Sequence, residues 1–238
     1  MAEERVDKLL SSTGHWSRKE VKELIKRGCV KANGVTVHKP EEKYSVEHTV
    51  FLVHGQVVDC QPYVYLMLHK PAGVLSATED RDQETVLDLL PEYLRRRKLF
   101  PVGRLDKDTE GLLLITDDGP LGHALLSPKK HVDKVYYAQV DGVITQEDVQ
   151  TLAQGMTLGD GFVCLPAKLE PIEDGRACLV TLQEGKYHQV KRMLAACGKP
   201  VVYLKRLSMG TLELDRQLKK GAWRPLTIHE LEGLKGKL

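Results

Sequence analysis

A run of six residues, 111–116, is apolar at almost every position and is followed directly by Asp117-Asp118-Gly119. A short apolar run that ends in turn-forming residues is typical of a buried β-strand. Patterns elsewhere predict strands at 63–68, 134–140 and 177–182, and helices at 86–94 and 189–197. Because these strands and helices do not alternate regularly, the sequence predicts an α+β fold rather than a doubly wound sheet.

The N-terminal part of the chain has the pattern of a separate small module. A helix is expected to begin at the capping-box pattern Ser17-Arg18-Lys19-Glu20, in which the first and last residues satisfy each other's backbone N–H groups. Asn33-Gly34 lies between two short β-prone runs, which predicts a tight hairpin. Residues 55–62 are interpreted as a linker, so the sequence predicts two domains, at 1–58 and 63–238.

The composition is that of a soluble globular protein, with 238 residues of which 42% are hydrophobic and 29% charged. No apolar run approaches the roughly 18 residues that a membrane helix needs. The first twelve residues also lack a basic segment followed by an apolar one, as a signal peptide would have. The five cysteines form no Cys-x-x-Cys pair, which favours a reducing compartment over a disulfide framework or zinc site. We therefore expect a cytoplasmic protein that has no membrane partner and binds no metal.

Charge is unevenly distributed along the chain, although the formal net charge is only +2. Residues 15–40 contain seven basic and two acidic residues, and residues 186–206 contain six basic residues and no acidic one. Residues 79–92 contain six acidic residues and a single Arg, which masks the basic segments in the total. Basic patches on two separate segments are suited to contacts with a nucleic-acid backbone.

Several motifs occur together in a fixed order. They are Lys70-Pro71-Ala72-Gly73, PVGRLDKDTEGLLLITDDG at 101–119, Lys134-Val135-Tyr136, EGKYHQVKRM at 184–193 and GTLELDRQLKKGAWRPLT at 210–227. In this order they resemble the pseudouridine synthases of the ribosomal small-subunit synthase A type, and the N-terminal module resembles the S4 RNA-binding domain. The resemblance covers nearly the whole chain. It implies a mixed, largely antiparallel central sheet flanked by helices, preceded by a small S4 (α-L) domain.

The resemblance implies site-specific isomerisation of uridine to pseudouridine in ribosomal RNA, with no cofactor. The bond between N1 and C1′ breaks, the uracil turns, and C5 then bonds to C1′. A carboxylate can serve this reaction by attacking C1′, by attacking the uracil ring, or by removing a proton from C2′. The sequence leaves these three routes open. It contains no phosphate-binding glycine loop, which agrees with a redox-neutral reaction that needs no energy donor.

The resemblance also assigns catalytic roles. Asp106 in Gly-Arg-Leu-Asp is the catalytic carboxylate, Tyr136 stacks on the uracil, and Lys191 is the cation beside the carboxylate. Taken singly, these residues would be interpreted as a turn-capping aspartate, a core tyrosine and a surface lysine. Contacts with RNA are expected from a further set of basic residues, which are Arg104, Arg18, Lys19, Lys22, Lys26, Arg27, Lys31 and Arg192.

Two aromatic residues close in sequence to the predicted catalytic residues are not assigned a catalytic role. His188 is interpreted as structural or RNA-contacting rather than as a general base, and Tyr137 as a core side chain on the opposite face from Tyr136.

The expected partner is ribosomal RNA or an assembling ribosomal subunit, and the protein is expected to be a monomer. The lack of a long basic tail after Leu226 favours the small subunit. The alternatives are a synthase that acts on large-subunit RNA and a catalytically silent S4-type protein of ribosome assembly.

Overall fold

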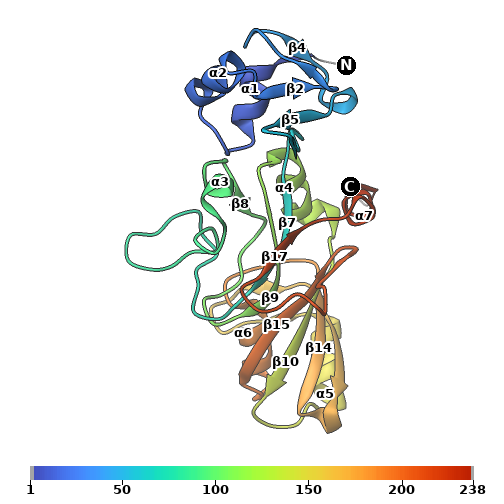
Figure 1. Cartoon of the computed structure of the whole chain (residues 1–238). Helices are drawn as coiled ribbons and strands as arrows, with labels where there is room; N and C mark the ends of the chain where they lie inside the picture. Colours follow the sequence, from blue (N-terminus) through green and yellow to red (C-terminus); the bar gives the residue numbers. More distant parts are fainter. Residues whose placement is uncertain (1–2, 237–238) are drawn as a thin grey trace. The chain divides into compact units, whose positions relative to one another are not determined.

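The computed structural model describes residues 3–236, and the chain forms two compact units (Figure 1). One unit contains the chain up to residue 64 together with residues 90–99, and the other contains residues 65–89 and the chain from residue 100 onward. The predicted domains follow the chain in order, whereas the N-terminal unit also takes in this short later segment. The outermost residues of both predicted domains, 1–2 and 237–238, lie outside the described part.

The part of the N-terminal unit before residue 65 combines two α-helices with a small antiparallel sheet, and the later segment adds the short helix α3 (Glu92–Arg95). The two helices before residue 65 are α1 (Val6–Ser12) and α2 (Arg18–Lys26). The sheet order is β3 (Val35–Thr36), β2 (Val30–Ala32), β5 (Phe51–Val53) and β6 (Gln56–Val58), and β1 (Glu4–Arg5) pairs separately with β4 (Lys43–Tyr44). Leu10 and Val21 from the helices and Phe51 from the sheet share one buried cluster, so a single core holds the unit together.

Both local predictions in this unit are confirmed. The hydroxyl of Ser17 accepts a hydrogen bond from the Glu20 N–H at 3.3 Å, and the Glu20 carboxylate accepts one from the Ser17 N–H at 2.7 Å. Asn33 and Gly34 have φ angles of 49° and 83°, the left-handed pair that a two-residue hairpin turn requires.

The predicted linker at 55–62 is wrong in part, because β6 occupies the middle of it. His54 and Gly55 join β5 to β6 with φ angles of 51° and 80°, so a second tight hairpin is present. Histidine adopts a left-handed backbone less readily than glycine does. The sequence signal for this turn is therefore weaker than that of Asn-Gly.

The predicted helix at 86–94 is also wrong, since only α3 (Glu92–Arg95) is helical there. The Asp88 carboxylate accepts hydrogen bonds from the N–H and the hydroxyl of Thr85 at 2.8 and 2.9 Å, which fixes a turn instead. Pro91 then disfavours a helical conformation at the residue before it and itself caps the start of α3.

The second unit is built on a mixed sheet. The sheet order is β13 (Lys168–Ile172), β14 (Ala177–Leu182), β10 (Lys134–Val140), β15 (Val201–Met209), β9 (Glu110–Thr116), β7 (Tyr65–Lys70) and β17 (Trp223–Pro225). Two short strands lie off this path, β8 (Phe100–Pro101) against β9 and β16 (Leu212–Glu213) against β15. Every pairing along the path is antiparallel except β15 with β9, which is parallel. The predicted mixed, largely antiparallel sheet is confirmed.

Helices flank both ends of this sheet (Figure 1). They are α4 (Gly119–Leu126), α5 (Gln146–Gln154), α6 (Gln189–Ala196) and α7 (Ile228–Gly236). One buried cluster joins β9 to α4 and α7, and another joins β10 and β14 to α5 and α6. Within residues 3–236, no helix has the length and apolar character needed to cross a membrane.

Strand β9 is the predicted apolar run, and all of its residues are buried. Gly111 on this strand, with a φ of 111°, faces the parallel strand β15. A Cβ atom there would lie 2.2 Å from the carbonyl oxygen of Arg206, so only glycine permits this close approach. The pairing fixes the start of β9, directly after the Gly-Arg-Leu-Asp loop.

Candidate active site

A buried lysine organises the loop that carries Asp106. Lys70, at the end of β7, is completely buried, and burial lowers the pKa of its ammonium group to about 8. Its Nζ lies 3.1 Å from the carbonyl oxygen of Asp106 and 2.9 Å from that of Thr109. The carbonyl oxygens of Pro71 and Lys107 are also within 3.2 Å. Four acceptors around three N–H donors saturate this group, which fixes the backbone on both sides of Asp106.

A serine secures the same loop from the other side. Ser76 accepts a hydrogen bond from the Leu105 N–H at 3.1 Å, and its hydroxyl donates to the Leu105 carbonyl oxygen at 2.9 Å. Neither Ser76 nor the role of Lys70 was predicted from the sequence. A lysine at the end of a strand whose first four residues are Tyr-Leu-Met-Leu is the signal that could have indicated a buried, hydrogen-bonded ammonium group.

Asp106 lies between two basic side chains that come from the start of α6. Lys191 Nζ is 3.5 Å from one carboxylate oxygen, and His188 Nε2 is 3.6 Å from the other. Both distances are long for a hydrogen bond. The Asp106 side chain is 24% exposed, so its oxygens are accessible while positive charge stands close by.

Lys191 is shared between two carboxylates. It donates a hydrogen bond to Asp108 at 2.5 Å, and this bond lowers the pKa of the Asp108 carboxyl group. Asp108 is not among the predicted site residues, yet it holds the ammonium group beside Asp106. Its position two residues after the predicted catalytic aspartate is the signal for it.

A pocket opens at Asp106, and Tyr136 lines the same pocket together with Arg104, His188, Leu182 and Leu204. Tyr136 on β10 is 7% exposed and also belongs to the buried cluster beneath α6. A wider cleft of about 980 Å³ adjoins the pocket and shares Arg104, Asp106 and His188 with it. The structure thus brings Asp106, Tyr136 and Lys191 into one locality, with Lys191 in contact with Asp106.

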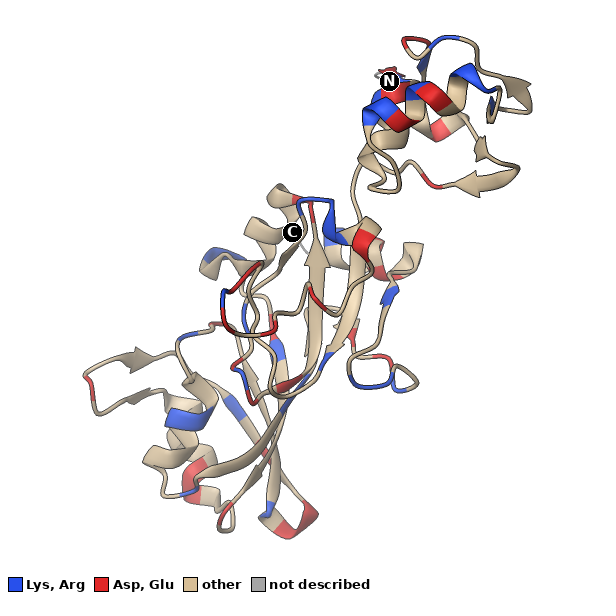
Figure 2. Ribbon diagram, turned by 60° about the vertical axis from the view of Figure 1, so that its left-hand side comes forward, with Lys and Arg blue, Asp and Glu red and all other residues tan. Residues whose placement is uncertain are grey.

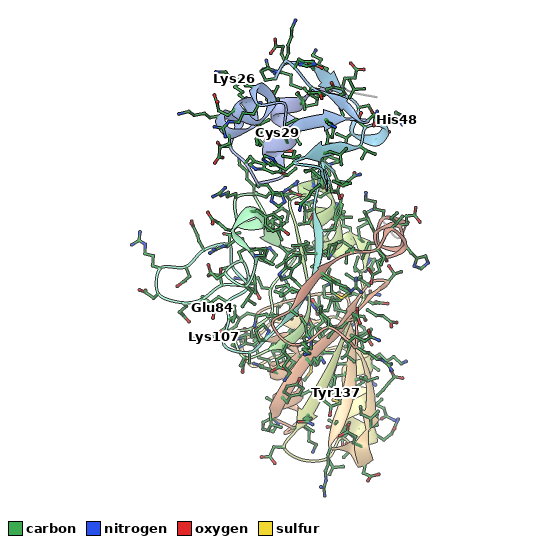
Figure 3. The ribbon with its side chains drawn as sticks, in the orientation of Figure 1. Lys26, Cys29, His48, Glu84, Lys107 and Tyr137 are labelled. Carbon is green, nitrogen blue, oxygen red and sulfur yellow. The ribbon has the colours of Figure 1, made fainter. Side chains whose placement is uncertain are left out.

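Tyr137 differs from its expected role as a core side chain. It is half-buried, and its hydroxyl donates to the Glu173 carboxylate at 3.1 Å and accepts from the Gln139 amide at 3.0 Å. Its ring meets that of Tyr203 edge-on, with centroids 6.1 Å apart. Tyr137 is labelled in Figure 3, where it lies on the lower part of the sheet.

The basic residues expected to contact RNA have different surroundings. Six of them come from the N-terminal unit, where Figure 2 colours the Lys and Arg positions of the ribbon blue. All six are exposed: Arg18, Lys19, Lys22, Lys26, Arg27 and Lys31. Arg104 is exposed beside the pocket. Arg192 instead forms an ion pair with Asp160 at 2.5 Å, so a contact with phosphate would compete with this carboxylate.

The fold and the carboxylate of Asp106 in its pocket agree with the families whose models match this sequence. The family model for RNA pseudouridylate synthase matches residues 64–196, and that for the S4 domain matches residues 4–50. The chain therefore belongs to the RNA pseudouridylate synthase family and carries an S4 domain.

Several relatives match this chain over nearly their whole length. An uncharacterized RNA pseudouridine synthase of Bacillus subtilis is 48% identical, over 95% of this chain and 96% of the relative. Ribosomal small subunit pseudouridine synthase A of Pseudomonas aeruginosa is 41% identical, over 95% of this chain and 98% of the relative. Ribosomal large subunit pseudouridine synthase B of Bacillus subtilis is 37% identical, over 98% of this chain and 96% of the relative. A crystal structure of a pseudouridylate synthase is 36% identical with a TM-score of 0.69, and covers 97% of this chain and 99% of that one.

Proposed function

We propose that this synthase isomerises a specific uridine of small-subunit ribosomal RNA, with Asp106 as the catalytic carboxylate. The observation that carries the proposal is the presentation of Asp106 in a pocket that Tyr136 also lines. Four relatives called small subunit synthase A, at 36–41% identity, support the choice of subunit. The large-subunit relative at 37% identity keeps the alternative substrate as an outcome of the test.

The proposed roles follow from the surroundings of each side chain. Asp106 is the group that acts on the sugar or the base, since its oxygens are accessible in the pocket. Lys191 stabilises the negative charge of Asp106 from 3.5 Å, because opposite charges this close attract each other. Tyr136 presents the face of a largely buried ring on which the uracil stacks. After the base has turned, its hydroxyl takes up the proton that leaves C5 and passes its own proton to solvent.

Three chemical routes share these positions. Asp106 can attack C1′, attack the uracil ring, or remove the C2′ proton, and each route needs an ionised carboxylate held rigidly next to the nucleotide. The rigid loop supports all of them, because Lys70 and Ser76 fix the backbone before and after Asp106.

The target uridine must leave its helix or stack before it reaches this pocket. Extrusion of a base costs on the order of a few kcal/mol, and contacts with the RNA backbone offset that cost. Exposed basic residues of the S4 domain and Arg104 at the pocket are the side chains proposed for these contacts. We place the protein in the cytoplasm as a monomer that acts on ribosomal RNA or on an assembling subunit.

Mapping pseudouridine across both ribosomal RNAs tests this function. A strain that lacks the protein should lose one modification in small-subunit RNA, and the wild-type chain should restore it. Loss of a large-subunit modification would move the substrate to that RNA. An unchanged map in both RNAs would contradict the enzymatic proposal and favour a role in RNA binding alone.

A further inference from the structure

A stacked pair of aromatic side chains lies at the edge of the wide cleft. The rings of Tyr187 and His188 have centroids 3.8 Å apart and planes inclined by only 17°. Tyr187 is 71% exposed, and both residues line the cleft. His188 lies 3.6 Å from Asp106. An exposed tyrosine is therefore connected to the proposed catalytic carboxylate through one intervening ring.

The backbone holds this pair rigidly. His188 has a left-handed conformation, with a φ of 50°, which is uncommon for a non-glycine residue. The next residue, Gln189, is 4% exposed, and its side chain accepts from the Lys186 N–H at 3.0 Å and donates to Glu184. These hydrogen bonds hold the loop before α6, so the two rings are stacked without bound RNA.

The wall of the cleft around this pair is apolar and exposed. Leu126, Val163 and Leu165 line the cleft with exposures of 44%, 67% and 48%. Glu184 links the segment that contains Leu165 to the start of α6, because it accepts hydrogen bonds from both the Leu165 N–H and the Gln189 side-chain amide. Exposed apolar side chains gathered in one place mark an interaction surface.

Cations border the same surface. Lys186 is exposed and lies 5.5 Å from the centre of the Phe162 ring, and Arg104 is exposed on the cleft. Exposed aromatic rings bordered by basic side chains are the combination with which proteins bind unpaired nucleotides, through base stacking and backbone contacts.

We propose that the Tyr187–His188 pair stacks on an unpaired base next to the target uridine and so positions the nucleotide that enters the Asp106 pocket. The proposal rests on the proposed function and adds a specificity residue to it. Tyr187 acts as a positioning residue, because its own ring touches the neighbouring base and not the reacting atoms. The preferred RNA is single-stranded beside its target, and duplex RNA is a poor ligand at this point.

Substitutions at Tyr187 separate a stacking role from a structural one. Tyr187→Ala removes the ring, Tyr187→Phe keeps it, and Val202→Ala is the matched control, because Val202 is 67% exposed and belongs to the outer surface of β15. Small-subunit ribosomal RNA transcribed with tritium at uridine C5 reports each isomerisation, since C5 loses its hydrogen. We expect Tyr187→Ala to raise KM by about tenfold with little change in kcat, and the other two variants to stay within about twofold of the wild type.

A second readout measures stacking without catalysis. A single-stranded oligoribonucleotide with 2-aminopurine beside a uridine should lose fluorescence when the wild-type protein or Tyr187→Phe binds it, and keep it with Tyr187→Ala. Equal quenching by all three proteins, or an unchanged KM for Tyr187→Ala, would overturn the stacking proposal. Quenching by the wild type without tritium release would instead contradict the proposed substrate and leave the stacking surface in place.

Discussion

Two carboxylates of the second unit have opposite surroundings. Glu230 on α7 accepts two hydrogen bonds from the Arg224 guanidinium at 2.8 and 2.9 Å and one from the Thr227 N–H at 2.8 Å. These bonds lower the pKa of Glu230 to about 2, with Arg224 as the main cause. Asp106 has the Lys191 ammonium group at 3.5 Å and the His188 imidazole at 3.6 Å, and it stands open to a pocket.

The contrast separates a structural carboxylate from a reactive one. The oxygens of Glu230 accept hydrogen bonds from fixed partners, and Glu230 forms a capping box with Thr227. Glu230 therefore joins β17 to α7, and its oxygens are not available to a ligand. The oxygens of Asp106 are held near positive charge without short bonds to it. A carboxylate placed this way keeps its oxygens available to a substrate.

The largest effect is expected at Asp106. Asp106→Asn keeps the shape of the side chain but removes its charge, so tritium release from uridine-labelled RNA should fall by about a thousandfold or more. The thermal midpoint should stay within about 2 °C, because no short hydrogen bond of the Asp106 carboxylate is lost. A variant that modifies RNA at the normal rate would remove Asp106 from the proposed mechanism.

Lys191 should come next. Lys191→Met removes the cation at 3.5 Å from Asp106, and we expect kcat to fall by about a hundredfold, as when one charge-stabilising donor is deleted from an active site. Lys191→Arg keeps the charge and should recover much of this loss. Single-turnover rates at saturating enzyme measure both. Equal losses in the two variants would point to packing rather than charge.

Glu230 should affect stability and not catalysis. Its pKa is lowered in the folded state, so its contribution is present above about pH 4.5 and is lost as the pH falls toward 2. Glu230→Gln should lower the unfolding free energy by about 2 kcal/mol at pH 7, and the gap from the wild type should close below about pH 3. The exposed Glu232→Gln is the matched control. Loss of activity in a folded Glu230→Gln variant would contradict the conclusion that Glu230 is structural while Asp106 is reactive.

The smallest effects are expected for the exposed basic side chains of the S4 domain, which belong to a different unit from Asp106 and Glu230. Lys22→Ala or Lys26→Ala on α2 should weaken RNA binding only about two- to threefold, and each should reduce the salt slope of log K by about one. Lys43→Ala, an exposed lysine of the same unit that lies outside the predicted set, is the control. Affinity that does not change with salt would mean that the basic face of α2 is ordinary solvated surface.

Sequence reasoning predicted the parts that local patterns determine. The apolar run gave β9, the capping box gave α2, and the position of Asp106 followed from its motif. Helices α4 and α5 were not predicted, although Asp118 and Thr145 cap them by hydrogen bonds to N–H groups three residues on. Those signatures were readable, but the apolar pattern of both helices is less pronounced than that of α2 or α6.

The rest depends on contacts between distant residues, which no local pattern shows. Lys70 meets the carbonyl of Asp106 across 36 positions, and Lys191 meets Asp108 across 83. His54-Gly55 forms a hairpin turn at the start of the predicted linker, and the helix predicted from periodicity at 86–94 is present only after Pro91. Tertiary contacts and individual backbone angles decided each of these cases.

The ammonium group of Lys70 makes the catalytic loop sensitive to alkaline pH. With its pKa lowered to about 8, Lys70 has only two N–H donors left for four carbonyl oxygens once the pH rises above that value. The unfolded chain keeps its proton up to about pH 10.5, so this group favours folding more as the pH rises between the two values. Activity should therefore decline above pH 8 while the thermal midpoint does not fall on account of Lys70. Parallel pH profiles of tritium release and of unfolding would show the two diverging.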